Sequence, residues 1–186
     1  MASPAEAPKI ATIQNDSVAP KMPNPHYRQQ EESISVALTH DILDPLSIMA
    51  EVKSPKAGAI VLFAGTTRDN FDGKPVTHLE YTSYPPRALQ TMISIARSVK
   101  AKHSLTAICM IHRLGVVPIS EESILIAVSA PHRHAAWRGG EEALEECKEK
   151  AEVWKLEEFG GEEGGVWRAN RDGAKGVRYD GGPEEG

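Results

Sequence analysis

Arg68, His132 and Arg133 are basic residues placed where side chains often bind anions. Arg68 follows an apolar run that ends at Gly65, and its planar guanidinium could hold a phosphate through two parallel hydrogen bonds. His132 and Arg133 open an expected helix, where free N–H groups and the helix dipole attract anions. A surface loop arginine and an ordinary helix start are the alternatives, and both interpretations stay open.

Lys148 and Lys155 are two further cations that could act together. They are seven residues apart, so a helix that continues through both would place them on one face. Val153 and Trp154 could bury the stem of Lys155, and a lysine partly desolvated near another cation can serve in acid–base or covalent chemistry. The alternative is a solvated helix with Glu–Lys pairs, which the many neighbouring glutamates favour.

The two cysteines, Cys109 and Cys147, form neither a disulfide framework nor a zinc motif. Cys147 could act as a sulfur nucleophile. However, it falls in register with Ala143 and Leu144 on the apolar face of an expected helix. We therefore predict that both thiols are buried, in a reducing compartment.

Several classes of site and partner are disfavoured. His132 and His134 have no third metal ligand at a recognisable spacing, so we expect no metal. The glycine-rich dinucleotide motif, the phosphate loop and the nucleophile elbow are absent, and we expect no cofactor. The formal charge of −5 disfavours nucleic acid. Residues 141–163 carry most of the acidic surplus, with ten Glu and three Lys, so a basic pocket elsewhere remains compatible with this charge.

The elements that must position these residues follow from hydrophobic periodicity. Strands are predicted at Ser33–Leu38, Ala59–Ala64, Val76–Tyr84, Leu105–Ile111 and Ser123–Val128. Helices are predicted from Pro45 to about Val52, from Pro85 to about Val99, and from about Pro131 to Ala151. Their order indicates an α+β domain with a mostly antiparallel sheet and packed helices.

Composition divides the chain into three parts. Residues 1–30 hold five of the 13 prolines and few large apolar side chains, which predicts a disordered extension. Residues 31–159 should form the globular domain. Residues 160–186, rich in Gly and Glu, should be an irregular tail anchored near Trp167. No apolar run approaches the roughly 18 residues that span a bilayer, and no secretory signal is visible. We expect a soluble cytosolic protein without a membrane partner.

Taken in order, these motifs resemble the large, catalytic subunit of molybdopterin synthase. The matching segments are Phe63–Arg68, Leu79–Tyr84, Ile111–Gly115, Ala130–Trp137, Lys148, Trp154–Glu157, Trp167 and Asn170. The resemblance extends over about residues 33–171. It implies an α/β hammerhead fold and an enzyme that adds sulfur to cyclic pyranopterin monophosphate in molybdenum-cofactor biosynthesis.

The resemblance also implies partners. Two copies of this chain would form the centre of a heterotetramer, with a small ubiquitin-like sulfur carrier at each end. The C-terminal Gly-Gly of the carrier, bearing a thiocarboxylate, would enter a pocket of the large subunit. Since substrate and thiocarboxylate are both anionic, the pocket needs several fixed cations.

By the same resemblance, five basic residues acquire roles. Arg68, His132 and Arg133 should hold the phosphate or the pterin, some of them across the dimer boundary. Lys148 should lie beside the thiocarboxylate and stabilise the oxyanion of the transfer adduct. Lys155 should be the second catalytic cation, which helps to open the cyclic phosphate or transfers a proton.

The remaining site residues implied by the resemblance flank these cations. Glu157 should orient Lys155 or the substrate, and Thr66, Thr67 and Leu156 should contact the substrate. Arg171 should close the pocket from the tail. Because the carrier supplies the sulfur, no cysteine of this chain is required.

The chain departs from the usual family pattern at four positions. Thr82, Arg87, Ser120 and Glu152 stand where a Glu, a Met, a Gly and a Pro are usual. None of them is expected at the chemical centre, although Glu152 makes the loop before Trp154 less predictable.

Two alternatives stay open: a non-catalytic anion-binding dimer that recognises a protein C-terminus, and a sulfurtransferase that uses Cys147 as a persulfide carrier.

Overall fold

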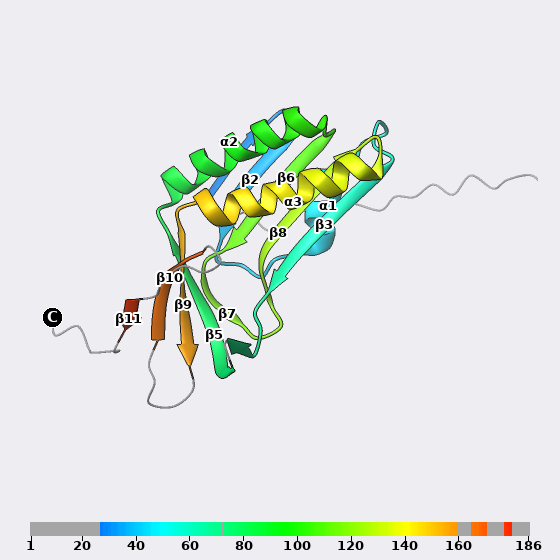
Figure 1. The fold of residues 1–186 in the computed structure, drawn as a ribbon. Coiled ribbons are helices and arrows are strands. Elements are labelled where there is room, and N and C mark those ends of the chain that lie inside the picture. Colours follow the sequence, from blue (N-terminus) through cyan, green and yellow to red (C-terminus); the bar gives the residue numbers. More distant parts are fainter. Residues whose placement is uncertain (1–26, 72, 160–164, 171–176, 180–186) are drawn as a thin grey trace, which may run out of the picture.

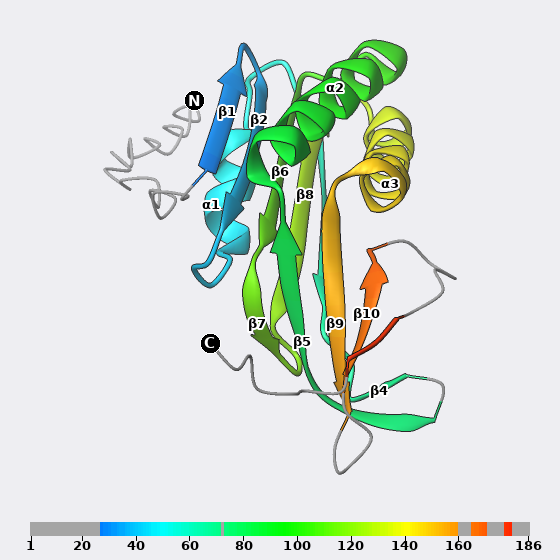
Figure 2. The same ribbon diagram turned by 90° about the vertical axis from the view of Figure 1, so that its left-hand side faces the viewer.

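Two β-sheets and three helices make up the part of the chain that the structure describes. The structure is a computed structural model of the 186-residue chain, and it describes residues 27–71, 73–159, 165–170 and 177–179. Figure 1 and Figure 2 show the helices against one sheet, while the second sheet extends away from them.

The first sheet has five strands in the order β1-β2-β6-β8-β3, and within it only β2 and β6 run parallel. Its strands are β1 (Tyr27–Glu31), β2 (Ile34–Thr39), β6 (Ala107–Arg113), β8 (Glu122–Ala130) and β3 (Ala59–Thr66). Helices α2 (Pro85–His103) and α3 (Arg133–Lys150) cover one face, and α1 (Pro45–Glu51) covers the other (Figure 1).

Coverage of both faces explains the long apolar runs of the central strands. Every residue of β2 and of β6 is buried, and in β8 only the first residue, Glu122, is not. A sheet buried on both faces needs apolar residues on both, so its strands lose the alternation of a half-buried strand. Cys109 lies in the core cluster under α1, and Cys147 lies in the larger cluster under α2 and α3.

The second sheet is antiparallel and has the order β11-β10-β9-β5-β4, with β7 also paired to β5. Its strands are β11 (Val177–Tyr179), β10 (Gly165–Ala169), β9 (Val153–Phe159), β5 (Lys74–Ser83), β4 (Asn70–Phe71) and β7 (Gly115–Pro118). The fold is therefore α+β and largely antiparallel, as predicted from the sequence.

Helix α3 does not continue through both Lys148 and Lys155, which is the condition under which they would share one helix face. Helix α3 ends at Lys150, and β9 begins at Val153 after a connection of two residues. The second of these, Glu152, accepts hydrogen bonds from Arg87 Nε (2.9 Å) and Thr91 Oγ1 (2.8 Å) of α2. The chain turns here because Ala151 adopts extended backbone angles, and its N–H still bonds to the carbonyl of Cys147.

All the predicted strands and helices are present. Six further strands, most of them short or near the C-terminus, were not predicted from the sequence: β1, β4, β7, β9, β10 and β11. The tail contains two strands where we expected irregular chain, and Trp167 lies in one of them, opposite Leu156. Residues 27–30 belong to β1, so the ordered chain begins before residue 31. Residues 1–26 lie outside the described part. No described helix is long and apolar enough to cross a membrane.

Candidate active site

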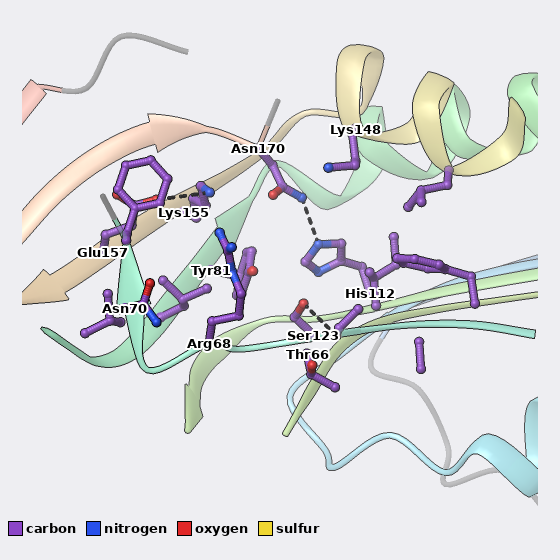
Figure 3. A pocket seen from close by; sticks show the side chains of 18 residues that line it. Thr66, Arg68, Asn70, Tyr81, His112, Ser123, Lys148, Lys155, Glu157 and Asn170 are labelled. Atoms are coloured by element: carbon purple, nitrogen blue, oxygen red, sulfur yellow. Dashed lines mark hydrogen bonds and ion pairs between the residues drawn. The ribbon is translucent and has the colours of Figure 1, made fainter. Parts of the chain in front are cut away.

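A cavity of about 460 Å³ lies where the two sheets meet, beside the last turn of α3 (Figure 3). Strand β3 and the loop after it form one wall, and β5 and β9 form another. The ends of β6 and β8 form the floor. The pairing of β3 with β8 is irregular between Gly65 and Thr66, and both residues line the cavity. The chain leaves the first sheet at this point.

Three cations from separate elements line this cavity. Arg68 follows β3, Lys148 is in the last turn of α3, and Lys155 is the third residue of β9. The reversal of the chain after Lys150 brings Lys148 and Lys155 to the same cavity. The two lysines therefore meet across this turn and not along one face of a helix.

Glu157 is a buried carboxylate in this wall. Its side chain is 2% exposed, and it pairs with Lys155 Nζ at 3.1 Å. The two residues are two apart on β9 and therefore point to the same face of the sheet. The structure thus places Glu157 in contact with Lys155, while its predicted orienting role stays a prediction.

A neutral polar surface completes the cavity, and the sequence did not identify it as part of the site. Tyr81, His112, Ser123 and Asn170 line it together with the cations (Figure 3). The His112 and Asn170 side chains are hydrogen-bonded, with 3.0 Å between Nε2 and Nδ2. Burial lowers the pKa of His112 to about 4, so this imidazole is neutral at physiological pH.

Tyr81 is held in place by its neighbours. Its ring meets the imidazole of His112 edge to face, with 4.8 Å between the centroids. Burial raises the pKa of the Tyr81 hydroxyl; the charge of Glu157 adds to this, and a hydrogen bond with Ser123 opposes it. His112 and Tyr81 fell inside segments noted for their resemblance, but their types alone did not distinguish them from core residues.

The predicted substrate contacts beside the cations fall in different places. Thr66 is exposed and lines the cavity. Thr67 is buried away from it, where its hydroxyl donates to the carbonyl of Val117 at 3.3 Å and fixes the exit of β3. Leu156 is buried on the face of β9 opposite to Lys155 and does not line the cavity. Of these three, the structure brings only Thr66 to the cations.

His132 and Arg133 do not lie in this cavity. They are exposed at the start of α3, which is 18 residues long, whereas Lys148 is in its last turn. At 1.5 Å per residue, Arg133 and Lys148 are about 22 Å apart along the helix. A single copy of the chain therefore does not unite all the predicted cations. Arg171 lies outside the described residues.

Two further expectations concern the thiols and the metal ligands. Cys147 is 3% exposed, and burial raises its pKa to about 12. Cys109 is 1% exposed, and its pKa is raised still further by burial and by the charge of Glu51. Both thiols stay protonated and are poor nucleophiles. Among the described residues, no group of three or more His, Cys, Asp or Glu is placed to hold a metal.

The site as a whole is that of an enzyme for an organic anion. Cations on one side and neutral donors and acceptors on the other suit a molecule that has both a charged group and a polar ring system. Such groups act strongly because the protein fixes them before the substrate arrives.

Comparisons with known proteins agree with this class. A family model described as MoaE protein matches residues 38–150. The molybdopterin synthase catalytic subunit of Sclerotinia sclerotiorum is 75% identical over 150 residues, which is 81% of this chain and 76% of that protein. Molybdopterin synthase from Staphylococcus aureus superposes with a TM-score of 0.66 at 31% identity, covering 70% of this chain and 94% of that one.

A structure of the complex of subunits 1 and 2 of molybdopterin-converting factor from Helicobacter pylori shares the fold. Its TM-score is 0.57 at 22% identity, covering 67% of this chain and 85% of that one. The chain belongs to the MoaE family of molybdopterin synthase catalytic subunits, which are sulfur-transferring enzymes of molybdenum-cofactor biosynthesis.

Proposed function

We propose that this chain transfers sulfur from the thiocarboxylated C-terminal Gly-Gly of a small ubiquitin-like carrier to cyclic pyranopterin monophosphate. The observation that carries the proposal is the convergence of Arg68, Lys148 and Lys155, from three separate elements, on one cavity of about 460 Å³. Two anions must meet for this reaction, and fixed cations offset their repulsion.

Within the cavity the cations have distinct tasks. Lys148 lies beside the carrier's terminus, orients the thiocarboxylate and stabilises the oxyanion of the adduct. Lys155, oriented by its ion pair with Glu157, acts on the cyclic phosphate or transfers a proton. Arg68 and Thr66 bind the phosphate. The neutral polar surface of Tyr81, His112, Ser123 and Asn170 contacts the pterin.

The transfer can be balanced without a sulfur atom from this chain. The thiocarboxylate sulfur bonds to a carbon of the pterin side chain and stays linked to the carrier's acyl carbon. As this bond forms, a carbon–oxygen bond of the substrate breaks, and its oxygen leaves as water or stays on the phosphate, whose ring then opens. Water then attacks that acyl carbon, and the acyl carbon–sulfur bond breaks. The carrier leaves as a carboxylate, and the pterin keeps a thiolate. A second carrier repeats the sequence, which gives the dithiolene.

A second copy of this chain supplies His132 and Arg133 to the substrate, or places them next to it. The distance along α3 from Arg133 to Lys148 supports this arrangement, since one copy cannot bring both to one small molecule. Trp137 lies one turn after Arg133 and is 65% exposed, which supports an interface on this part of α3. We propose a central dimer with one carrier at each end; the Helicobacter protein was solved as a complex of two different subunits.

The buried thiols argue against the persulfide alternative, because neither Cys109 nor Cys147 is exposed or ionised. Protonated thiols also fit the cytosol, which we propose as the location. The other alternative, a binding module without catalysis, predicts carrier affinity but no product.

Reconstitution tests the proposal directly. The full chain, a thiocarboxylated carrier and cyclic pyranopterin monophosphate are mixed, and the dithiolene pterin is detected. We expect product with the native chain and a loss of at least about a hundredfold in turnover for Lys148→Ala. Lys150→Ala is the matched control, because Lys150 is on the same helix but is exposed and pairs with Glu146. Carrier binding without product, or equal rates for the two variants, would contradict the proposal.

A further inference from the structure

Arg168 holds the buried carboxylate of Glu157 from the side opposite to Lys155. Arg168 Nε lies 3.0 Å from Oε2 of Glu157, and Lys155 Nζ lies 3.1 Å from Oε1. Arg168 on β10 is paired directly with Lys155 on β9, so the three side chains share one face of the second sheet. One carboxylate therefore binds two cations, one through each oxygen.

The aromatic ring of Phe71 also contacts Lys155 and Arg168. Its ring centroid lies 5.8 Å from Lys155 Nζ and 5.1 Å from the guanidinium carbon of Arg168. A cation at this distance over an aromatic face is attracted to the ring. Lys155 and Phe71 line the cavity, whereas Arg168 does not. Arg168 therefore does not contact a bound substrate directly. Any effect that it has on the substrate must come from its charge or from the side chains that it contacts.

The negative charge of Glu157 would repel an anionic substrate in the cavity. The carboxylate is 2% exposed, so water screens it poorly. Its field reaches the cavity, since it contributes to the raised pKa of Tyr81, after burial. Paired with Lys155 alone, Glu157 would cancel the positive charge that Lys155 offers to the substrate. With Arg168 included, the group of three carries a net charge of +1.

We infer that Arg168 is a positioning residue whose charge offsets Glu157, so that Lys155 keeps its full attraction for an anionic substrate while the carboxylate holds its ammonium group in place. The inference rests on the proposed function for the identity of the substrate. It assigns a role to a residue of β10 that is outside the cavity and that residue types alone did not single out.

The test compares three variants of the full chain. Arg168→Gln keeps an N–H donor for Glu157 but removes the charge. Arg168→Lys keeps the charge. The double variant Arg168→Gln with Glu157→Gln removes both charges and restores the net +1 through Lys155. Arg97→Gln is the matched control, because Arg97 on α2 forms an ion pair with Glu31 of β1, away from the cavity.

We expect Arg168→Gln to raise the dissociation constant and the KM for cyclic pyranopterin monophosphate by about tenfold, with a smaller change in kcat. Arg168→Lys should stay within about threefold of the native chain, and the double variant should recover most of the lost affinity. A purely structural role would not produce this recovery. Native affinity in Arg168→Gln, or no recovery in the double variant, would overturn the inference.

Two readouts separate this inference from the proposed function. Affinity is measured by calorimetry with cyclic pyranopterin monophosphate and no carrier, and turnover is measured with the carrier. Absence of product from the native chain would refute the proposed function, while the calorimetric comparison would still decide the role of Arg168. If Arg168→Gln does not fold, the double variant decides, since the inference requires it to fold and to bind.

Discussion

Asn170 donates a hydrogen bond from its side-chain amide to Nε2 of His112, across 3.0 Å. The direction follows from the other ring nitrogen. Nδ1 of His112 lies 2.7 Å from the carbonyl of Arg113, which can only accept, so Nδ1 carries the proton. In a neutral imidazole Nε2 is then the acceptor. The Asn170 amide is thus oriented, and its oxygen is left to face the cavity (Figure 3).

We predict that Asn170→Asp raises the pKa of His112 well above its present value of about 4. A carboxylate can only accept, so it contacts Nε2 favourably when that nitrogen carries a proton. The pKa is measured by following the imidazole signals by NMR as the pH is changed. Asn170→Leu is the uncharged control. A His112 pKa that is the same in both variants would show that the two side chains do not contact each other in solution.

The neutral state of His112 makes stability depend on pH. Its folded pKa of about 4 lies below the ordinary value of 6.5, so between these values the unfolded chain binds more protons. This contribution is fully present above about pH 6.5 and is lost as the pH falls toward 4. We expect the free energy of unfolding to fall by about 2 kcal/mol from pH 7 to pH 5 through this residue alone.

Urea unfolding at several pH values measures this loss. His112→Gln has no titrating group at this position, so its stability should change less between pH 7 and pH 5. His134→Gln removes an exposed imidazole and should behave like the native chain. The same pH dependence in all three proteins would mean that folding does not lower the pKa of His112.

The sequence predicted the elements that have strong local signals. Asp44 and Pro45 specified the start of α1, and the Asp44 side chain does accept from the N–H of Leu46 at 2.9 Å. The apolar runs of β3, β6 and β8 were recognised because helices cover both faces of their sheet. Strands β7 and β9 were missed because their pairing with β5 is a long-range contact that leaves little periodicity in four to seven residues.

The site was only partly predictable for the same reason. Charge and position made Arg68, Lys148 and Lys155 candidates, and the family resemblance gave them roles. The alternation of a strand could have linked Lys155 to Glu157 had β9 been recognised. Arg168 and Asn170 could not be placed, because they reach the cavity region through the pairing of β10 with β9. The resemblance also implied Thr67 and Leu156, but each follows a residue that lines the cavity, and neighbours on an extended chain point in opposite directions.

Replacement of both cysteines by Ala should leave sulfur transfer largely intact. Cys109 and Cys147 are buried and protonated, and the carrier supplies the sulfur in the proposed reaction. We expect turnover within about threefold of the native chain, with a stability loss of about 1–2 kcal/mol from the lost packing. Circular dichroism confirms folding before turnover is measured. Near-complete loss of activity in a folded double variant would restore a cysteine mechanism.

Glu152 and Arg87 are two of the departures from the family pattern, and they contact each other. Glu152 lies between α3 and β9, and its carboxylate is bound by Arg87 at 2.9 Å and Thr91 at 2.8 Å. Burial opposes its ionisation, but these hydrogen bonds outweigh that effect and lower the pKa of Glu152. The backbone carbonyl of Glu152 also accepts from Ser83 at 2.8 Å. These bonds tie the turn between Lys148 and Lys155 to α2 and β5.

We therefore predict that Glu152→Ala destabilises the chain by about 1–2 kcal/mol, because it removes two hydrogen bonds to a charged group that join distant elements. Glu146→Ala is the matched control: the Glu146 side chain is 25% exposed, against 22% for Glu152, but it pairs only with Lys150 one turn away. Such a pair contributes about 0.5 kcal/mol or less. Because the pKa of Glu152 is lowered from its ordinary value of 4.5, its contribution is fully present above that pH, and the difference between the two variants should shrink as the pH falls below about 4.5. Urea unfolding at pH 7 and pH 4 measures both effects, and equal losses in the two variants would mean that the turn is held by its backbone alone.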